Sequence, residues 1–393
     1  MKAMKWKFYS LAFVAGMSIL TACSSDDNND NDGNGGNGNG NEIENGTILK
    51  GTITSDVTLA AGNTYKLSGE YIVEEGATLH IEEGVKIIAV YDDIADYILV
   101  KQGGKINAVG TPDKPIVMTS EKEEPGAWGG IHICGRAHTN AEGGKGSSEI
   151  GGAVYGGNDD ADNSGTLQYI RLEYTGFAFD EEHEANGISF YGVGNGIIVD
   201  HCQAYKGSDD GFEFFGGSVN VSNLVAVSCS DDSFDWTEGW NGKGTNLVAY
   251  QEDKSTLGYD CDCLMECDNN GSNNAATPVA HPVLKNLILV GNGGSKQGIR
   301  LRAGTEVEID NAKVCGKGQP LTVETALTEN ALKNGTSKLT NITLTSELSS
   351  KEGIYTHADF IAVTSNKVDA NLSYSSFEDI RKECSWMNGS WVK

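Results

Sequence analysis

Paired aspartates followed by a third acidic residue occur twice at the same spacing in this chain. Residues 208–214 are Ser-Asp-Asp-Gly-Phe-Glu-Phe, and residues 230–236 are Ser-Asp-Asp-Ser-Phe-Asp-Trp, a displacement of 22 residues. A repeat of this length between strand-like segments is typical of a solenoid, in which equivalent residues of successive coils stack. Stacking would bring six carboxylates together in two adjacent coils.

Six stacked carboxylates could bind a hard cation. Like charges about 5 Å apart repel by roughly 3 kcal/mol at an effective dielectric near 20, and by under about 1 kcal/mol in water. A partly dry cluster therefore needs a cation or a proton, and Ca²⁺ suits a multidentate oxygen site. In a wet cluster the aspartates need only hydrogen-bond the backbone of turns, and both interpretations stay open. The calcium candidates are Asp209, Asp210, Asp231 and Asp232.

Short strands separated by Gly, Asn and Asp must position these residues. One family of strand segments begins at Tyr169, His201, Asn223, Asn246, Asn286, Asn311 and Asn341, and a second comprises 187–190, 211–214, 233–236 and 298–301. Two families in one register describe the coils of a parallel β-helix whose larger steps are loop insertions. We predict an all-β solenoid over 46–393, with an insertion near 252–282. Residues 47–73 are expected to cover one open end and the C-terminal tail the other.

Alternation along the second family predicts which side chains face outward. Successive side chains of a strand point to opposite faces, so the apolar residues would stack inside and Ser189 would share an outer face with charged residues. The ligand-binding candidates on or beside that face are Glu213, Asp235, Trp240, Arg300 and Arg302. The arginines could bind a carboxylate of a ligand or neutralise the acidic residues, and we favour the second. Trp240 is the candidate platform for a sugar, because the same alternation places Trp236 in the core.

Composition and charge exclude one class of partner. The chain contains 51 Gly and only 6 Pro among 393 residues, which favours a turn-rich all-β protein. Its formal net charge is −26, and removing Lys2, Lys5 and Lys7 with the first 22 residues makes it −29. A surface of this sign repels phosphate backbones, so nucleic acid is not an expected partner.

The N-terminus has the pattern of an export signal. A basic segment is followed by an apolar one and by Leu20-Thr-Ala-Cys23, which resembles the lipobox of bacterial lipoproteins. The resemblance implies a signal peptide over 1–22, lipid attachment at Cys23 and a tether over 23–45. The acidic segment 24–32 resembles tethers that send some lipoproteins to the cell surface, so we expect anchoring in the outer membrane, facing the exterior. An ordinary secretory signal followed by a solvated linker is the alternative.

Eight cysteines remain beyond Cys23. An even number suits disulfides in an exported protein, and we favour disulfide bonding of the segment that contains Cys261, Cys263 and Cys267. Zinc binding by these three residues is the alternative. Cys202 occupies the position of Leu224 one coil later, which predicts a buried thiol.

Four further segments carry a family resemblance. Residues 76–84, 102–111, 114–120 and 126–131 together resemble a family of largely uncharacterised Bacteroidetes outer-membrane lipoproteins. The resemblance covers most of 46–393 and implies a right-handed parallel β-helix, but no catalytic residue.

These observations favour a non-catalytic binding module on the cell surface, for glycans or another surface protein, with Ca²⁺ as the candidate cofactor. A polysaccharide lyase or glycoside hydrolase is the alternative, because β-helices of these classes use paired carboxylates, calcium and Arg. The Gly-His-Gly and Arg-x-Lys elements that accompany the paired aspartates of polygalacturonase-type hydrolases are absent. A purely structural surface protein is the third interpretation.

Overall fold

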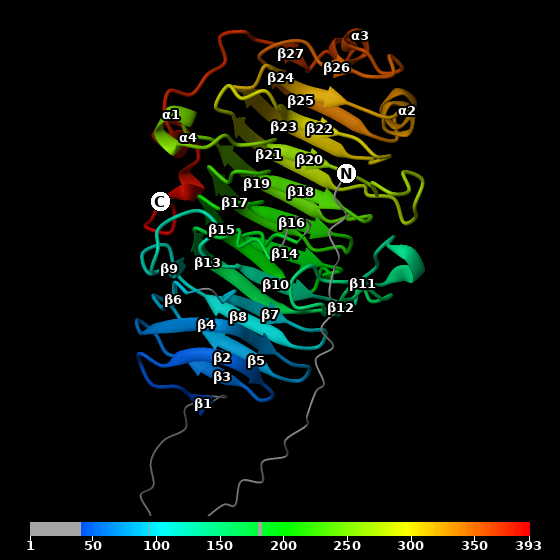
Figure 1. The fold of residues 1–393 in the computed structure, drawn as a ribbon. Coiled ribbons are helices and arrows are strands. Elements are labelled where there is room, and N and C mark those ends of the chain that lie inside the picture. Colours follow the sequence, from blue (N-terminus) through cyan, green and yellow to red (C-terminus); the bar gives the residue numbers. More distant parts are fainter. Residues whose placement is uncertain (1–40, 93, 180–182) are drawn as a thin grey trace, which may run out of the picture. The chain divides into compact units, whose positions relative to one another are not determined.

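Parallel strands dominate the computed structural model, which describes residues 41–92, 94–179 and 183–393 (Figure 1). The predicted signal peptide, Cys23 and most of the predicted tether lie outside the described residues. The strands stack in three columns. The first contains β1 (Asn41–Glu42), β3 (Val57–Leu59), β5 (Thr78–Ile81), β8 (Lys105–Val109) and the first halves of β13 (Gly165–Glu173), β15 (Ile198–Tyr205), β17 (Val221–Val227), β19 (Lys243–Tyr250), β21 (Val283–Val290), β23 (Glu308–Cys315) and β25 (Lys338–Leu344).

The second column continues from the first across a bend in the chain. It contains β2 (Ile48–Ile53), β4 (Thr64–Val73), β6 (Lys86–Ala89), β9 (Ile116–Ser120), the second halves of the long strands from β13 to β25, and β27 (Lys367–Val368).

The third column carries the repeated acidic segments. It begins with the ends of β2 and β4 and continues through β7 (Tyr97–Val100), β10 (Ile131–Cys134), β14 (Ile188–Tyr191), β16 (Phe212–Phe215), β18 (Phe234–Thr237), β20 (Met265–Cys267), β22 (Gln297–Leu301), β24 (Gln319–Val323) and β26 (Ser349–Ser350). Within each column, the strands of successive coils pair in parallel. The predicted right-handed parallel β-helix is therefore confirmed.

Few other elements interrupt the strands. The strands β11 (Gly146–Ser147) and β12 (Val154–Tyr155) form an antiparallel pair, and the helices are α1 (Lys254–Leu257), α2 (Ala326–Asn334), α3 (His357–Ala362) and α4 (Phe377–Glu383), with 3₁₀ turns η1 (Glu142–Gly144) and η2 (Ser385–Met387). Among the described residues no helix has the length and apolarity needed to cross a membrane.

The core consists of the inward-facing side chains of all three columns. Phe190 stacks on Phe214 with ring centroids 5.1 Å apart, and Phe212 stacks on Phe234 at 5.6 Å. Trp236 is fully buried, as the alternation predicts. The same register that stacks these rings inside must stack the intervening residues outside.

Asparagines form the bend between the first and second columns. The residues that begin the first family of strand segments all have positive φ, from 51° at Tyr169 to 63° at Asn311. Asn tolerates this left-handed conformation better than most residues. Nδ2 of Asn246 donates to Oδ1 of Asn223 at 2.8 Å, and the pattern continues through Asn286 (3.0 Å) and Asn311 (2.9 Å). We call Asn223, Asn246, Asn286 and Asn311 the asparagine ladder.

The C-terminal tail does not cover an end of the solenoid, which corrects the prediction. Ile380, Met387 and Trp391 pack beside outward-facing apolar residues of the second column such as Val248 and Ile288. Figure 1 shows α4 and the C-terminus along one side of the strands, with α2 and α3 at the end that carries β26 and β27. Those helices contribute Leu332 and Phe360 to the core, and therefore close that end. Residues 47–73, expected to cover the other end, instead form coils of the solenoid itself, with strands β2 to β4.

Replacement of Asn286 tests the ladder. Asn286→Ala removes two side-chain hydrogen bonds of about 0.5–1.5 kcal/mol each. It also places alanine at positive φ, a backbone conformation that alanine adopts less readily than asparagine. We therefore expect the free energy of unfolding to fall by about 2–3 kcal/mol. Asn286→Gly relieves the backbone and should lose about 1 kcal/mol less. Urea unfolding measures both, with the exposed Asn371→Ala as the control. Equal losses for Ala and Gly would contradict the role of the bend.

Candidate cation-binding site

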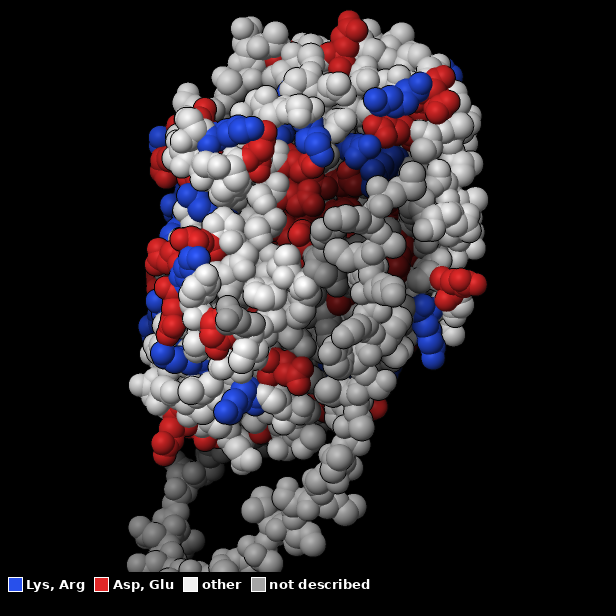
Figure 2. All heavy atoms as spheres, in the orientation of Figure 1, with Lys and Arg blue, Asp and Glu red and all other residues white. Residues whose placement is uncertain are grey.

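A row of polar side chains follows the outer face of the third column. The register pairs Glu213 of β16 with Asp235 of β18, Asp235 with Glu266 of β20, and Glu266 with Arg300 of β22. Figure 2 shows Asp and Glu side chains gathered in a hollow over β18 and β20, with Lys and Arg beside it. We call the following residues the acidic cluster: Asp209, Asp210, Glu213, Asp231, Asp232, Asp235, Asp262 and Glu266.

Two of the calcium candidates bond the backbone of the next coil. Oδ1 of Asp210 accepts the backbone N–H of Asp232 at 2.8 Å, and Oδ1 of Asp232 accepts the backbone N–H of Cys263 at 2.6 Å. The predicted stacking of Asp210 and Asp232 is therefore present, and both residues support turns in the way the turn interpretation expects. Each keeps its second carboxylate oxygen for another partner. Asp209 is buried beside them, whereas Asp231 is exposed at the edge of the cluster.

The third coil of the cluster was not predicted from the sequence. The segment expected as an insertion also supplies β20, which adds Glu266 directly beside Asp235. The spacing of the acidic residues could have predicted this coil, because Asp262 precedes Glu266 by four residues, as Asp231 precedes Asp235. The step from Asp231 to Asp262 is 31 residues rather than 22, which hides the repeat.

Arg300 and Arg302 neutralise only one end of the cluster. Arg300 donates to Glu266 at 2.8 Å and to Glu324 at 3.3 Å. Arg302 contacts Glu266 at 2.5 Å and Asp268 at 2.7 Å. These ion pairs are the contacts that a neutralising role of both arginines requires.

Among the described residues Glu213 and Asp235 form no ion pair of this kind. Glu213 accepts a hydrogen bond from Nδ2 of Asn186 at 2.5 Å, and the buried Oδ1 of Asp235 has no hydrogen-bond partner among the described residues. Burial raises the pKa of Asp235 well above its ordinary value and the neighbouring Glu266 raises it further, although the charge of Arg302 acts on Asp235 and lowers its pKa in part. Burial also raises the pKa of Glu213 well above its ordinary value, and the charge of Glu149 raises it further. Burial, followed by the charge of Asp231, raises the pKa of Asp209 to about 7.

The donor atoms are close enough to share an ion. One carboxylate oxygen from each of Asp210, Glu213 and Asp235 lies within 4.8 Å of the others, and Asp235 belongs to a second such group with Asp232 and Glu266. Two further groups share these neighbours, Asp209 with Asp210 and Asp231, and Asp232 with Asp262 and Cys263. Carboxylate oxygens are the ligands that Ca²⁺ prefers, so the residues fit a hard cation. Asp235 belongs to two of these groups and its buried Oδ1 lacks a hydrogen-bond partner among the described residues, so a cation at either group would use it as a ligand.

Two predictions about neighbouring residues require correction. Trp240 is only 1% exposed, because its ring stacks on Phe214 at 4.2 Å and its Nε1 donates to the carbonyl of Val219. It is therefore not available as a platform for a sugar. The eight described cysteines are buried free thiols, so the favoured disulfide in the segment of Cys261 is absent from the structure. Cys202 is fully buried, as predicted.

The chain matches a family model described as a pectate-lyase-like β-helix domain over residues 51–392. It therefore belongs to that family. No curated protein and no solved structure gave a significant match. The family match agrees with the fold and leaves open whether the outer face binds or cleaves a ligand.

The raised pKa of Asp235 predicts how stability depends on pH. Because its folded-state pKa lies above the unfolded value near 3.9, the folded state binds more protons between the two values, and stability falls as the pH rises above about 4. In EDTA at pH 7, the free energy of unfolding of Asp235→Asn, measured with urea, should therefore exceed that of wild type by more than about 1 kcal/mol. At pH 4 the two free energies should differ little. Asp113→Asn, at an exposed site, is the control. A variant less stable than wild type at pH 7 would refute the raised pKa.

Proposed function

We propose that this pectate-lyase-like β-helix is a surface-exposed lipoprotein that acts as a non-catalytic, calcium-assisted binding module for glycans. The observation that carries the proposal is the Asp235 carboxylate, which lies between Glu213 and Glu266 in the stacked register and whose buried oxygen lacks a hydrogen-bond partner. A divalent cation would relieve the repulsion between these carboxylates, which burial strengthens. Another surface protein remains the alternative ligand.

Calcium would also supply the contact with a glycan. Ca²⁺ takes six to eight oxygen ligands, so a site built from three carboxylates leaves coordination positions for hydroxyl or carboxylate oxygens of a ligand. A chain with a formal charge of −26 repels acidic glycans, and a bound cation would reverse that repulsion locally.

The ion pairs of the arginines favour binding over lyase chemistry. A lyase needs a basic group free to take a proton from the sugar, whereas Arg300 and Arg302 are both held by carboxylates. One observation favours a hydrolase as the second candidate. Oxygens of Glu213 and Asp235 lie within 4.8 Å of each other, near the separation of about 5–5.5 Å between the carboxyl groups of retaining glycosidases. Release of reducing sugar from a bound glycan would establish that alternative.

Calcium titration tests the proposal. We expect the full chain to bind Ca²⁺ in isothermal calorimetry with a Kd of about 0.1–1 mM, the range of extracellular modules, and to bind glycans on an array less well in EDTA. Asp235→Asn should weaken Ca²⁺ binding at least about tenfold, since it removes the shared ligand, whereas Asp113→Asn should leave it unchanged. Equal Ca²⁺ affinity of wild type and Asp235→Asn, or glycan binding insensitive to EDTA, would refute this role.

The proposed location depends on Cys23. The pattern Leu20-Thr-Ala-Cys23 supports lipid attachment, and the acidic segment behind it supports export to the outer face of the outer membrane. Labelled palmitate should enter the wild-type chain in bacterial cells and should be lost completely from Cys23→Ala. Cys202→Ala is the matched control. Labelling of Cys23→Ala would show that the cysteine is incidental, and protease treatment of intact cells tests whether the domain faces outward.

A further inference from the structure

A pocket lies between the asparagine ladder and the C-terminal tail, away from the acidic cluster. Its volume is about 310 Å³, at the lower limit for small-molecule sites. The ladder side contributes Asn246, Asn286 and Asn311, and the tail contributes Glu383 and Trp386. The strand residues of this pocket belong to the bend and the second column, whereas the acidic cluster lies on the third column.

Trp386 brings an aromatic ring to this pocket. It is half-buried and packs against the cluster that holds the tail on the strands. Its ring lies 6.3 Å from His201, edge to face, and 6.2 Å from Trp391. Neighbours thus fix the ring while part of it stays accessible, and such a ring can pack against the apolar face of a sugar.

The ladder offers hydrogen-bonding groups on the opposite wall. Each internal amide uses one N–H and one lone pair for its neighbours, which leaves a second N–H and a second lone pair. Asn286 and Asn311 are exposed. Their stacked spacing presents alternating donors and acceptors, as the hydroxyls of a sugar require.

The charged groups of the pocket favour a neutral ligand. Nζ of Lys313 contacts Glu383 at 2.5 Å, and the hydroxyl of Tyr374 donates to the other oxygen of Glu383 at 2.8 Å. The pair leaves no net charge, so nothing in the pocket attracts a phosphate or carboxylate against the negative charge of the chain.

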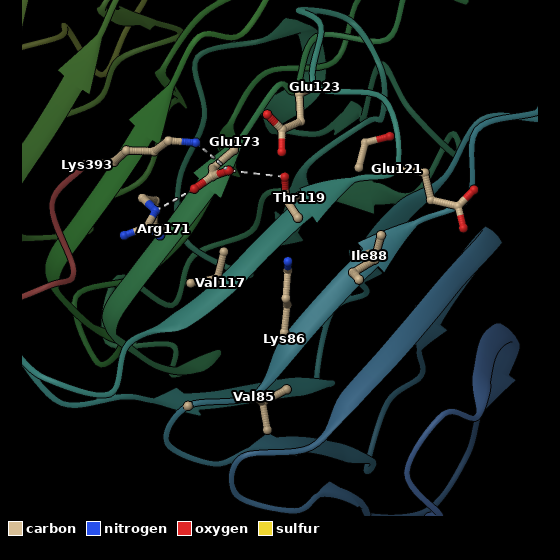
Figure 3. A pocket seen from close by; sticks show the side chains of 12 residues that line it. Val85, Lys86, Ile88, Val117, Thr119, Glu121, Glu123, Arg171, Glu173 and Lys393 are labelled. Carbon is tan, nitrogen blue, oxygen red and sulfur yellow. Dashed lines mark hydrogen bonds and ion pairs between the residues drawn. The ribbon is translucent and has the colours of Figure 1, made fainter.

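A second and larger pocket among the described residues lacks this combination. It has a volume of about 640 Å³ and lies around Lys86, Arg171 and Glu173 (Figure 3). Glu173 there accepts from Arg171 at 2.6 Å and from Lys393 at 3.1 Å, so its strongest charges satisfy one another. None of the described residues that line it is aromatic.

We propose that the pocket between the asparagine ladder and Trp386 binds a neutral carbohydrate, with a sugar ring against Trp386 and its hydroxyls bonded to Asn286 and Asn311. This site goes beyond the calcium-assisted function and does not rest on it. Its binding should be independent of calcium, because none of the acidic cluster lines the pocket.

The test begins with the full chain on an array of neutral and acidic glycans in EDTA. A neutral glycan that binds is then titrated by calorimetry against wild type and variants. Trp386→Ala should weaken binding at least about tenfold, whereas Tyr91→Ala, which removes an exposed aromatic elsewhere, should leave it unchanged. Trp386→Phe should retain part of the affinity. Asn311→Gly, which removes one of the two amides proposed to bond the sugar and tolerates the positive φ of this position, should weaken binding several-fold and serves if Trp386→Ala does not fold.

Three results would overturn the proposal: no neutral glycan bound in EDTA, unchanged affinity in Trp386→Ala and Asn311→Gly, or equal loss in Tyr91→Ala. Asp235→Asn separates the two sites, because it should weaken calcium-dependent binding and leave this binding intact.

Discussion

The hydrogen-bonded register between parallel strands of successive coils governs this molecule. Strands about 4.8 Å apart place equivalent side chains directly over one another, whatever those side chains are. Inside, the register stacks Phe190 on Phe214, which stabilises the core. At the bend it aligns asparagine amides that bond one another. On the outer face it forces Glu213, Asp235 and Glu266 together, which costs free energy unless a proton or cation intervenes.

The acidic face therefore differs in kind from the other two stacks. Aromatic and amide stacks are self-complementary, since each ring or amide satisfies its neighbour. A carboxylate stack is not, and the chain compensates it unevenly. Backbone N–H groups donate hydrogen bonds to Asp210 and Asp232, and arginines form ion pairs with Glu266. The buried Oδ1 of Asp235, between them, has no hydrogen-bond partner among the described residues. A purely structural solenoid gains nothing from such a residue, which is why we place the functional centre there.

Much of this arrangement could be predicted from the sequence, because the solenoid repeats short-range rules. The 22-residue displacement gave the register of Glu213 over Asp235, and alternation gave the burial of Trp236. The failures occur where those rules end. Trp240 follows a turn at Gly239, whose φ is 84°, so alternation no longer describes its direction and it packs on Phe214. The position of the tail depends on contacts with strands distant in the sequence, from Lys313, 70 residues before Glu383, to Arg171, 219 residues before Ser390, which no local pattern encodes.

An anomalous difference map from crystals grown with Ca²⁺ tests the central claim most directly. Our account predicts a peak bonded to the Asp235 carboxylate at about 2.3–2.6 Å, with oxygens of Glu213 and Asp210, or of Glu266 and Asp232, completing the protein ligands. A cluster without a peak, in which Asp235 instead shares a proton with Glu213 or Glu266, would contradict it.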